Sequence, residues 1–144
     1  MPIVHLQPSD LSAAQAAQVL DFLNRATSPA QLDRDIDADG LVQRMTVAAR
    51  LINAGLGLRV IDTAYGGFDT HSSQPQLFSE LLGEFDAGLR AFFTALDDRF
   101  RSRVTIMTYS EFGRTSWSND SDGTDHGTSA NHFIIGSAVQ GGLY

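Results

Sequence analysis

A long amphipathic segment with a short apolar run on each side constrains the fold of this chain most strongly. From Gln76 to about Phe100, apolar side chains recur at helical spacing, on Phe78, Leu81, Leu82, Phe85, Leu89, Phe92, Phe93 and Leu96. The flanking runs, LRVIDTAY (58–65) and VTIMTYS (104–110), are short, apolar and rich in β-favouring residues, as buried strands are. Strand, helix, strand is a βαβ unit, so the sequence predicts a parallel sheet with a right-handed crossover.

Further elements are predicted on both sides of this unit. Residues 132–139 read as a third strand, and Leu41, Met45, Ala48 and Ile52 repeat at helical spacing before the glycines of residues 53–57. Ser12 and Gln15 have the spacing of a capping box, which indicates a helix near the N-terminus. We therefore expect one partial α/β domain over residues 1–144. It would be a three-layer, mostly parallel sheet with flanking helices, with a helical and loop lead-in over residues 1–40 and the core over residues 41–144.

Composition excludes several classes of protein. The chain has 144 residues, a net charge of −7 and scattered basic residues, which argues against nucleic-acid binding. No run of apolar residues is long enough to span a membrane, and MPIVHLQPSD does not resemble a signal peptide. Cysteine is absent, so any metal must be held by His, Asp and Glu. The chain ends on a strand-like run followed by GGLY, and we expect it to be part of a longer protein or the product of a truncated gene model.

Polar residues follow the first two predicted strands at the points where these strands end. GGFDTH follows the first run and SEFGRT follows the second, with GTDHG a few residues later. Ligands of open α/β sheets bind outside the carboxyl ends of the strands. If the strands are parallel neighbours, the loops emerge at one edge, and their side chains are expected to converge.

Two pairs in these loops have the chemistry of metal ligands. Asp69 and His71 form a D-x-H pair behind two glycines, and Asp125 and His126 are adjacent between glycines. Carboxylate oxygen and imidazole nitrogen suit Zn²⁺ or Mn²⁺. The structural alternatives are that Asp69 caps its loop while His71 donates to a carbonyl, and that Asp125 and His126 belong to a flexible acidic loop.

Glu111 and Arg114 are the candidates for catalysis. A carboxylate at Glu111 suits a general base or a metal ligand, and Arg114 offers a planar fork to a phosphate, sulfate or carboxylate group. The alternative is a mutual ion pair that stabilises the loop. His132 is a reserve ligand or a structural histidine. No G-x-S-x-G elbow occurs, which disfavours a Ser-His-Asp hydrolase.

The stretches VAARLINAGLGLRV, GGFDTHSSQ, VTIMTYSEFGRT and GTDHGTSANHFIIGSAVQGGLY together resemble the DUF 1501 family, from about Leu41 to the end of the chain. Members are typically longer bacterial proteins with a twin-arginine export signal. They are similar in fold to the alkaline phosphatase and sulfatase superfamily, which carries a metal site, often of two ions, at the strand ends. The resemblance implies an exported or periplasmic location for the full-length protein.

The resemblance also implies roles for particular residues. Asp69, His71, Asp125 and His126 would be metal ligands, and Glu111 would stand where the superfamily more often has an aspartate. Phe112 stands where a histidine is common. The resemblance further implies that the superfamily's Ser or Thr nucleophile and another metal-binding Asp would lie in an N-terminal part, which we expect this sequence to lack.

Three functions follow as hypotheses. The first is metal-dependent hydrolysis of a phosphate or sulfate ester, with a small anionic ester or a sulfated or phosphorylated glycan as substrate. The second is an exported binding or surface module that kept the fold without the chemistry. The third is a fragment with no activity of its own.

Overall fold

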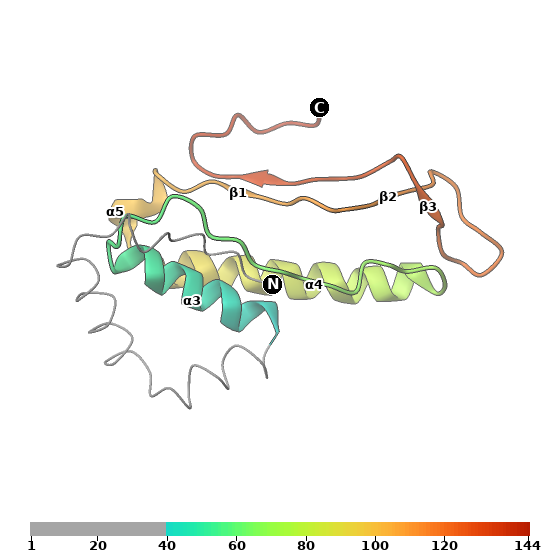
Figure 1. Cartoon of the computed structure of the whole chain (residues 1–144), viewed down its shortest axis with the longest axis horizontal. Helices are drawn as coiled ribbons and strands as arrows, with labels where there is room; N and C mark the ends of the chain where they lie inside the picture. The colour runs from blue at the N-terminus through green and yellow to red at the C-terminus, as the bar shows by residue number, and fades with distance from the viewer. Residues whose placement is uncertain (1–39) are drawn as a thin grey trace, which may run out of the picture. The chain divides into compact units, whose positions relative to one another are not determined.

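The computed structural model describes residues 40–144, and Figure 1 shows the order of their helices and strands. The helices are α3 (Leu41–Asn53), α4 (Gln74–Ala95) and α5 (Asp98–Arg101), and the strands are β1 (Ile106–Met107), β2 (Gly113–Arg114), β3 (His126–Gly127) and β4 (Ile134–Ile135). The described residues form two compact units, 40–65 with 84–97 and 66–83 with 98–144. The helix predicted near Ser12 lies outside the described residues.

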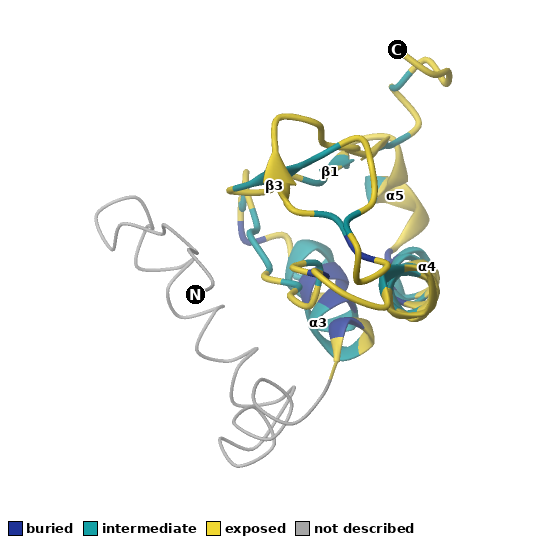
Figure 2. Ribbon diagram, turned by 90° about the vertical axis from the view of Figure 1, so that its right-hand side faces the viewer, coloured by how far each residue is buried: buried dark blue, intermediate teal, exposed yellow. Residues whose placement is uncertain are grey.

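The first unit packs α3 against the C-terminal part of α4. Among the described residues, the buried apolar side chains all belong to this unit: Leu41, Met45, Ala48, Ala49, Leu56, Phe92 and Leu96. Figure 2 shows buried positions in dark blue on α3. Gly88 lets the helices approach closely, because a Cβ there would lie 2.9 Å from Cγ of Leu41. This core is the main source of hydrophobic stabilisation in the described chain, at about 1.5–3 kcal/mol for each large buried side chain.

The N-terminus of α3 is capped by a residue distant in the sequence, and its C-terminus is followed by a glycine. The amide of Leu41 donates to Glu84 Oε1 at 3.0 Å, and the hydroxyl of Tyr65 donates to Glu84 Oε2 at 3.1 Å. At the other end Gly55 has a φ of 68°, the left-handed conformation that terminates helices. The helix predicted from Leu41 and its end at glycine are therefore confirmed.

The long amphipathic helix is also confirmed, with different bounds. α4 runs from Gln74 to Ala95 rather than from Gln76 to Phe100, and α5 follows as a separate turn. The amide of Asp97 donates to the side-chain oxygen of Asn53 at 2.9 Å, and the Asn53 amide group donates to the carbonyl of Ala95 at 2.8 Å. These bonds hold the end of α4 at the end of α3, which is consistent with α4 stopping before Phe100.

The prediction of a parallel sheet is wrong for the described residues, whose strands pair antiparallel. β1 pairs with β4 in the register Ile106 to Ile135, and β2 pairs with β3 in the register Gly113 to Gly127. The connection between these segments explains the direction. Parallel neighbours need a crossover, usually a helix, and the described residues between β1 and β4 contain no helix, so the chain returns as a hairpin.

The first predicted strand, LRVIDTAY, does not form one. Residues 58–65 have no strand partner among the described residues, and Val60 is 75% exposed. Arg59 and Asp62 interrupt the apolar run, so neither face of an extended chain here is wholly apolar. The three-layer arrangement expected around this strand is consequently not seen in residues 40–144. No helix in that range is both long and apolar enough to cross a membrane.

Candidate metal site

The loop of residues 66–73 carries the first predicted pair of ligands. Asp69 and His71 are exposed, whereas Thr70 between them is buried, and the amide of Thr70 donates to the carbonyl of Phe68 at 2.9 Å. The ring of Phe68 packs edge-on against Phe78, with centroids 5.7 Å apart. The loop is thus anchored through Phe68 and Thr70, while the carboxylate and the imidazole face solvent.

Main-chain hydrogen bonds join a second loop, residues 119–125, to the first loop and to the start of α4. The bonds join the amides of Ser73, Gln74 and Thr124 to the carbonyls of Ser121, Asp122 and Thr70, at 3.0, 2.8 and 3.4 Å. Gly123 is buried where the loops lie closest, and a Cβ there would collide with the carbonyl group of His71. Glycine at position 123 is therefore required for this approach.

The ribbon formed by β2 and β3 brings two more predicted residues to the same place. Arg114 lies directly opposite His126 in the register of the two strands. Gly113 and Gly127 are paired beside them, and a Cβ on Gly127 would lie 2.6 Å from the carbonyl oxygen of Arg114. The two strands can pair so closely because neither of these positions carries a side chain.

Three nitrogen atoms converge on one carboxylate oxygen, Oδ1 of Asp69. His126 Nε2 lies 2.7 Å from it, His71 Nε2 lies 2.8 Å from it, and Arg114 donates to it from Nη1 at 3.1 Å. The ligand atoms of Asp69, His71 and His126 all lie within 4.8 Å of one another, and no other group of this kind occurs in residues 40–144.

The donor set fits a divalent cation. In a tetrahedral zinc site with bonds of about 2.0–2.1 Å, neighbouring ligand atoms lie about 3.3 Å apart. The contacts of 2.7 and 2.8 Å at Asp69 are shorter, so the donors need to separate by about half an ångström to admit an ion. Three protein ligands on exposed side chains leave a further position for water or substrate, as in catalytic zinc sites.

His71 contacts a carboxylate with each of its ring nitrogens. Nε2 faces Asp69, and Nδ1 lies 3.3 Å from Oδ1 of Asp125. A neutral imidazole carries one N–H, so it can donate to one of these oxygens while the other nitrogen presents a lone pair. If a cation lies between Nε2 and Asp69 and the proton is on Nδ1, Nε2 can donate its lone pair to the cation and Nδ1 can donate its proton to Asp125.

The two carboxylates have lowered pKa values for different reasons. The pKa of Asp69 lies below its ordinary value mainly because of the hydrogen bond with His126, with a further contribution from the electrostatic interaction with His71. The pKa of Asp125 is lowered mainly by the hydrogen bond from Asn119 and then by the one with His71. Both groups are therefore ionised at neutral pH, the form in which a carboxylate can bind a cation.

Arg114 is the most buried of the charged groups at the site, with its side chain 15% exposed. Besides its bond to Asp69, it donates from Nη2 to the hydroxyl of Thr70 at 3.2 Å. Its Nε–H is buried and has no hydrogen-bond partner among the described residues. The guanidinium is held by the loop that carries the metal-ligand candidates and retains an unused donor.

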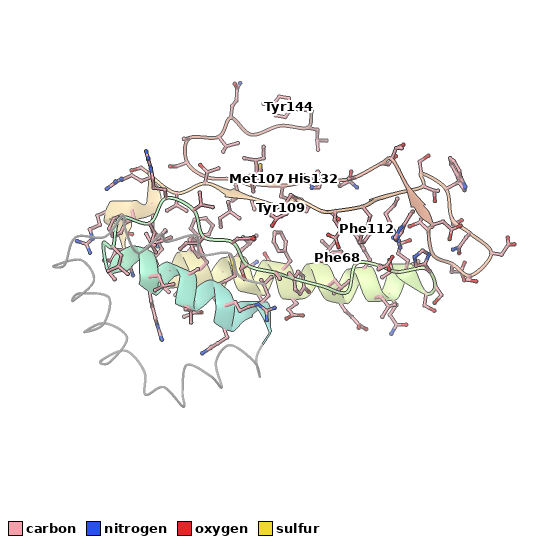
Figure 3. All side chains as sticks on the ribbon, viewed as in Figure 1. Phe68, Met107, Tyr109, Phe112, His132 and Tyr144 are labelled. Carbon is pink, nitrogen blue, oxygen red and sulfur yellow. The ribbon has the colours of Figure 1, made fainter. Side chains whose placement is uncertain are left out.

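The remaining predicted residues lie differently. Glu111 is exposed and, like Asp125, is not one of the three clustered ligands. The ring of Phe112 stacks on His126, with centroids 4.6 Å apart and planes 9° apart. His132 is exposed, and Figure 3 shows it apart from Phe112. The structure thus brings together Asp69, His71, Arg114 and His126, with Asp125 behind His71.

Sequence patterns did not single out Asn119, which bonds to both loops of the site. Its amide group donates to the carbonyl of His71 at 3.0 Å and to Oδ1 of Asp125 at 3.1 Å. The signal that could have found it is the turn-forming run SNDSDG, which overlaps GTDHG at Gly123, because asparagine in such runs bonds to nearby main chain.

Comparison with known families gives one result. A family model described as "Protein of unknown function (DUF1501)" matches residues 5–144. Searches against curated proteins and against solved structures find no match.

Proposed function

This chain belongs to the DUF1501 family, and we propose that it binds a divalent cation, Zn²⁺ or Mn²⁺, and hydrolyses phosphate or sulfate esters. The observation that carries the proposal is the convergence of His71, His126 and Arg114 on one oxygen of Asp69. Neutral imidazole nitrogens and a carboxylate oxygen are the ligands that these metals take in hydrolases. On this proposal the chain shares its chemistry with the alkaline phosphatase and sulfatase superfamily.

In this proposal each residue of the site has a separate role. Asp69, His71 and His126 hold the cation. When bound, the cation supplies Lewis-acid polarisation of the ester and lowers the pKa of a coordinated water. Arg114, which now donates to Asp69, would be available to bind the anionic oxygens of the substrate if a cation were to neutralise that carboxylate.

Glu111 is the residue we propose as general base or as an additional ligand. It is exposed and lies three residues before Arg114, at the start of the turn into β2. We propose a small anionic ester, or a sulfated or phosphorylated glycan, as the substrate class, since Arg114 recognises these groups by the same planar geometry. The exported location expected of family members is part of this proposal.

The stacking of Phe112 on His126 favours a second candidate function, a binding module that recognises an anionic ligand without turning it over. An apolar ring covers one face of His126 where the superfamily often carries a histidine. This arrangement offers one cluster of ligands rather than two, and Arg114 would still receive an anion.

Metal analysis of the purified protein tests the proposal. After loading with Zn²⁺ or Mn²⁺ and removal of excess ion, we expect about one ion per chain. His126→Ala removes a ligand and should abolish retention of the ion, whereas His132→Ala, an exposed histidine outside the cluster, should leave it unchanged. Wild-type protein that retains no metal under saturating conditions refutes the metal site.

Turnover separates the two candidate functions. The loaded protein should hydrolyse an aryl phosphate or aryl sulfate, and chelation or His126→Ala should stop this reaction. Anion or glycan binding that survives chelation, with no turnover in the loaded protein, identifies the binding module instead.

A further inference from the structure

Asn119 uses the full hydrogen-bonding capacity of its side chain at the candidate metal site. Its Nδ2 donates to the carbonyl of His71 and to Asp125 Oδ1, and its Oδ1 accepts from the amides of Ser121 and Gly123, each at 3.0 Å. The partners fix the orientation of this amide group, because a carbonyl and a carboxylate only accept and a main-chain N–H only donates. A flipped amide would lose all of these bonds.

The hydrogen bond from Asn119 also affects His71, because both side chains contact Asp125. The oxygen of Asp125 that accepts from Asn119 is the same Oδ1 that lies 3.3 Å from Nδ1 of His71. Asn119 therefore determines where this acceptor sits. Asp69 is the closer acceptor, on the Nε2 side at 2.8 Å, but a cation between Nε2 and Asp69 leaves Asp125 as the acceptor and keeps the proton of His71 on Nδ1. With its proton on Nδ1, His71 presents a lone pair at Nε2, the nitrogen that lies 2.8 Å from Asp69.

We infer that Asn119 is a positioning residue, which holds Asp125 as the hydrogen-bond acceptor that fixes the tautomer of His71. This inference rests on the proposed metal site and gives Asp125 a supporting role behind His71 instead of direct coordination. Carboxylates that accept from metal-bound histidines raise the affinity for the ion, and their loss typically costs 10–100-fold. Asn119 acts one step further out, through Asp125 and through the main chain of His71.

The first test variant is Asn119→Asp, which keeps the shape and the acceptor for Ser121 and Gly123 but loses both donors. The probe is Zn²⁺ alone, measured by competition with a chelating dye. We expect the affinity to fall about tenfold or more. Asn131→Asp, the same change at an exposed asparagine outside these contacts, is the matched control and should bind Zn²⁺ as the wild type does.

A second variant separates positioning from folding. Asn119→Asp should also lower the melting temperature, because it loses two hydrogen bonds. In Asn119→Asp with Asp125→Asn, the donor and the acceptor of the pair are exchanged, so part of this stability should return. The amide of the new asparagine then faces Nδ1 of His71 as a donor, which drives the proton of the ring to Nε2 and blocks coordination. We expect recovery of the melting temperature without recovery of Zn²⁺ affinity.

The outcomes distinguish this inference from the proposed function. Wild-type affinity in Asn119→Asp, or regained affinity in the exchanged pair, overturns the role of Asn119 while the metal site stands. If the wild type binds no Zn²⁺, the proposed function fails. The inference is then decided by histidine ¹⁵N spectra of the metal-free protein. A change in the His71 ring signals with Asn119→Asp, but not with Asn131→Asp, supports positioning, and unchanged signals overturn it.

Discussion

Replacing Gly123 with alanine tests the account of how the site is assembled. The added Cβ would meet main-chain atoms of the facing loop, colliding with the carbonyl group of His71 and lying 2.5 Å from the amide nitrogen of Ser72. These atoms belong to the backbone and cannot rotate away as a side chain could. The two loops must separate, and His71 moves with its own main chain.

The size of the effect follows from the distances. Relieving the contact with Ser72 alone requires a movement of about 0.5 Å, and the contacts with His71 require more. The main-chain bond from Gln74 to Asp122, now 2.8 Å, would lengthen to about 3.3 Å, and the 3.0 Å bond from Ser73 to Ser121 to about 3.5 Å. Losing such bonds costs about 0.5–1.5 kcal/mol each, so we expect a loss of about 1–3 kcal/mol of stability.

Thermal melting and zinc titration measure the two consequences. For a chain of this size, the melting temperature should fall by about 3–10 °C, and the affinity for Zn²⁺ should fall with it because His71 is displaced from Asp69. Gly66→Ala is the control, since a Cβ there has no atom within 4 Å and its φ is not positive. A Gly123→Ala protein with the melting temperature and zinc affinity of Gly66→Ala would show that the loops are not in this contact.

The stability of the protein should depend on pH and on Zn²⁺ in three further ways. Folding lowers the pKa values of Asp69 and Asp125, so the stability that these carboxylates contribute is present above about pH 4 and is lost as the pH falls through their folded pKa values. Asp69→Asn should therefore make the stability depend less on pH in acid denaturation followed by circular dichroism. Burial, together with Glu84, raises the pKa of Tyr65 to about 12. The stability that Tyr65 contributes to the fold is therefore complete below about pH 10 and declines above it. Tyr65→Phe should remove this decline and also the late step of a tyrosinate absorbance titration. Zn²⁺ at 100 times its dissociation constant should stabilise the wild type by about 2.7 kcal/mol in calorimetry, and His126→Ala should abolish this shift.

The helices could be predicted from the sequence because their signals are local. The repeat of Leu41, Met45 and Ala48 marks the buried face of α3, and Gly55 supplies the left-handed residue that ends it. The separation of α5 from α4 could not be predicted in this way. It accompanies bonds between Asn53 and the end of α4, which join residues more than 40 positions apart.

The strands could not be predicted because pairing depends on partners and connections. VTIMTYS contributes two residues to β1, and its partner β4 comes from the run that starts at His132, both as expected in place but antiparallel in direction. Apolar content alone does not encode direction, which is set by the connection. LRVIDTAY has the composition of a strand, but no strand pairs with it in the described part of the chain.

The candidate site shows how residues that were expected to meet can come together through a geometry other than the predicted one. Asp69, His71 and His126 were expected to meet at the edge of a parallel sheet, yet they meet because β2 pairs with β3 and because the two loops are bonded through their main chains. In extended chain, neighbouring side chains point to opposite sides. Asp125 immediately precedes β3, and its carbonyl accepts from the amide of Thr115 at 2.8 Å, so its side chain and that of His126 diverge. His126 turns to Asp69 while Asp125 reaches the far side of His71, so the two neighbours in the sequence contact different members of the site.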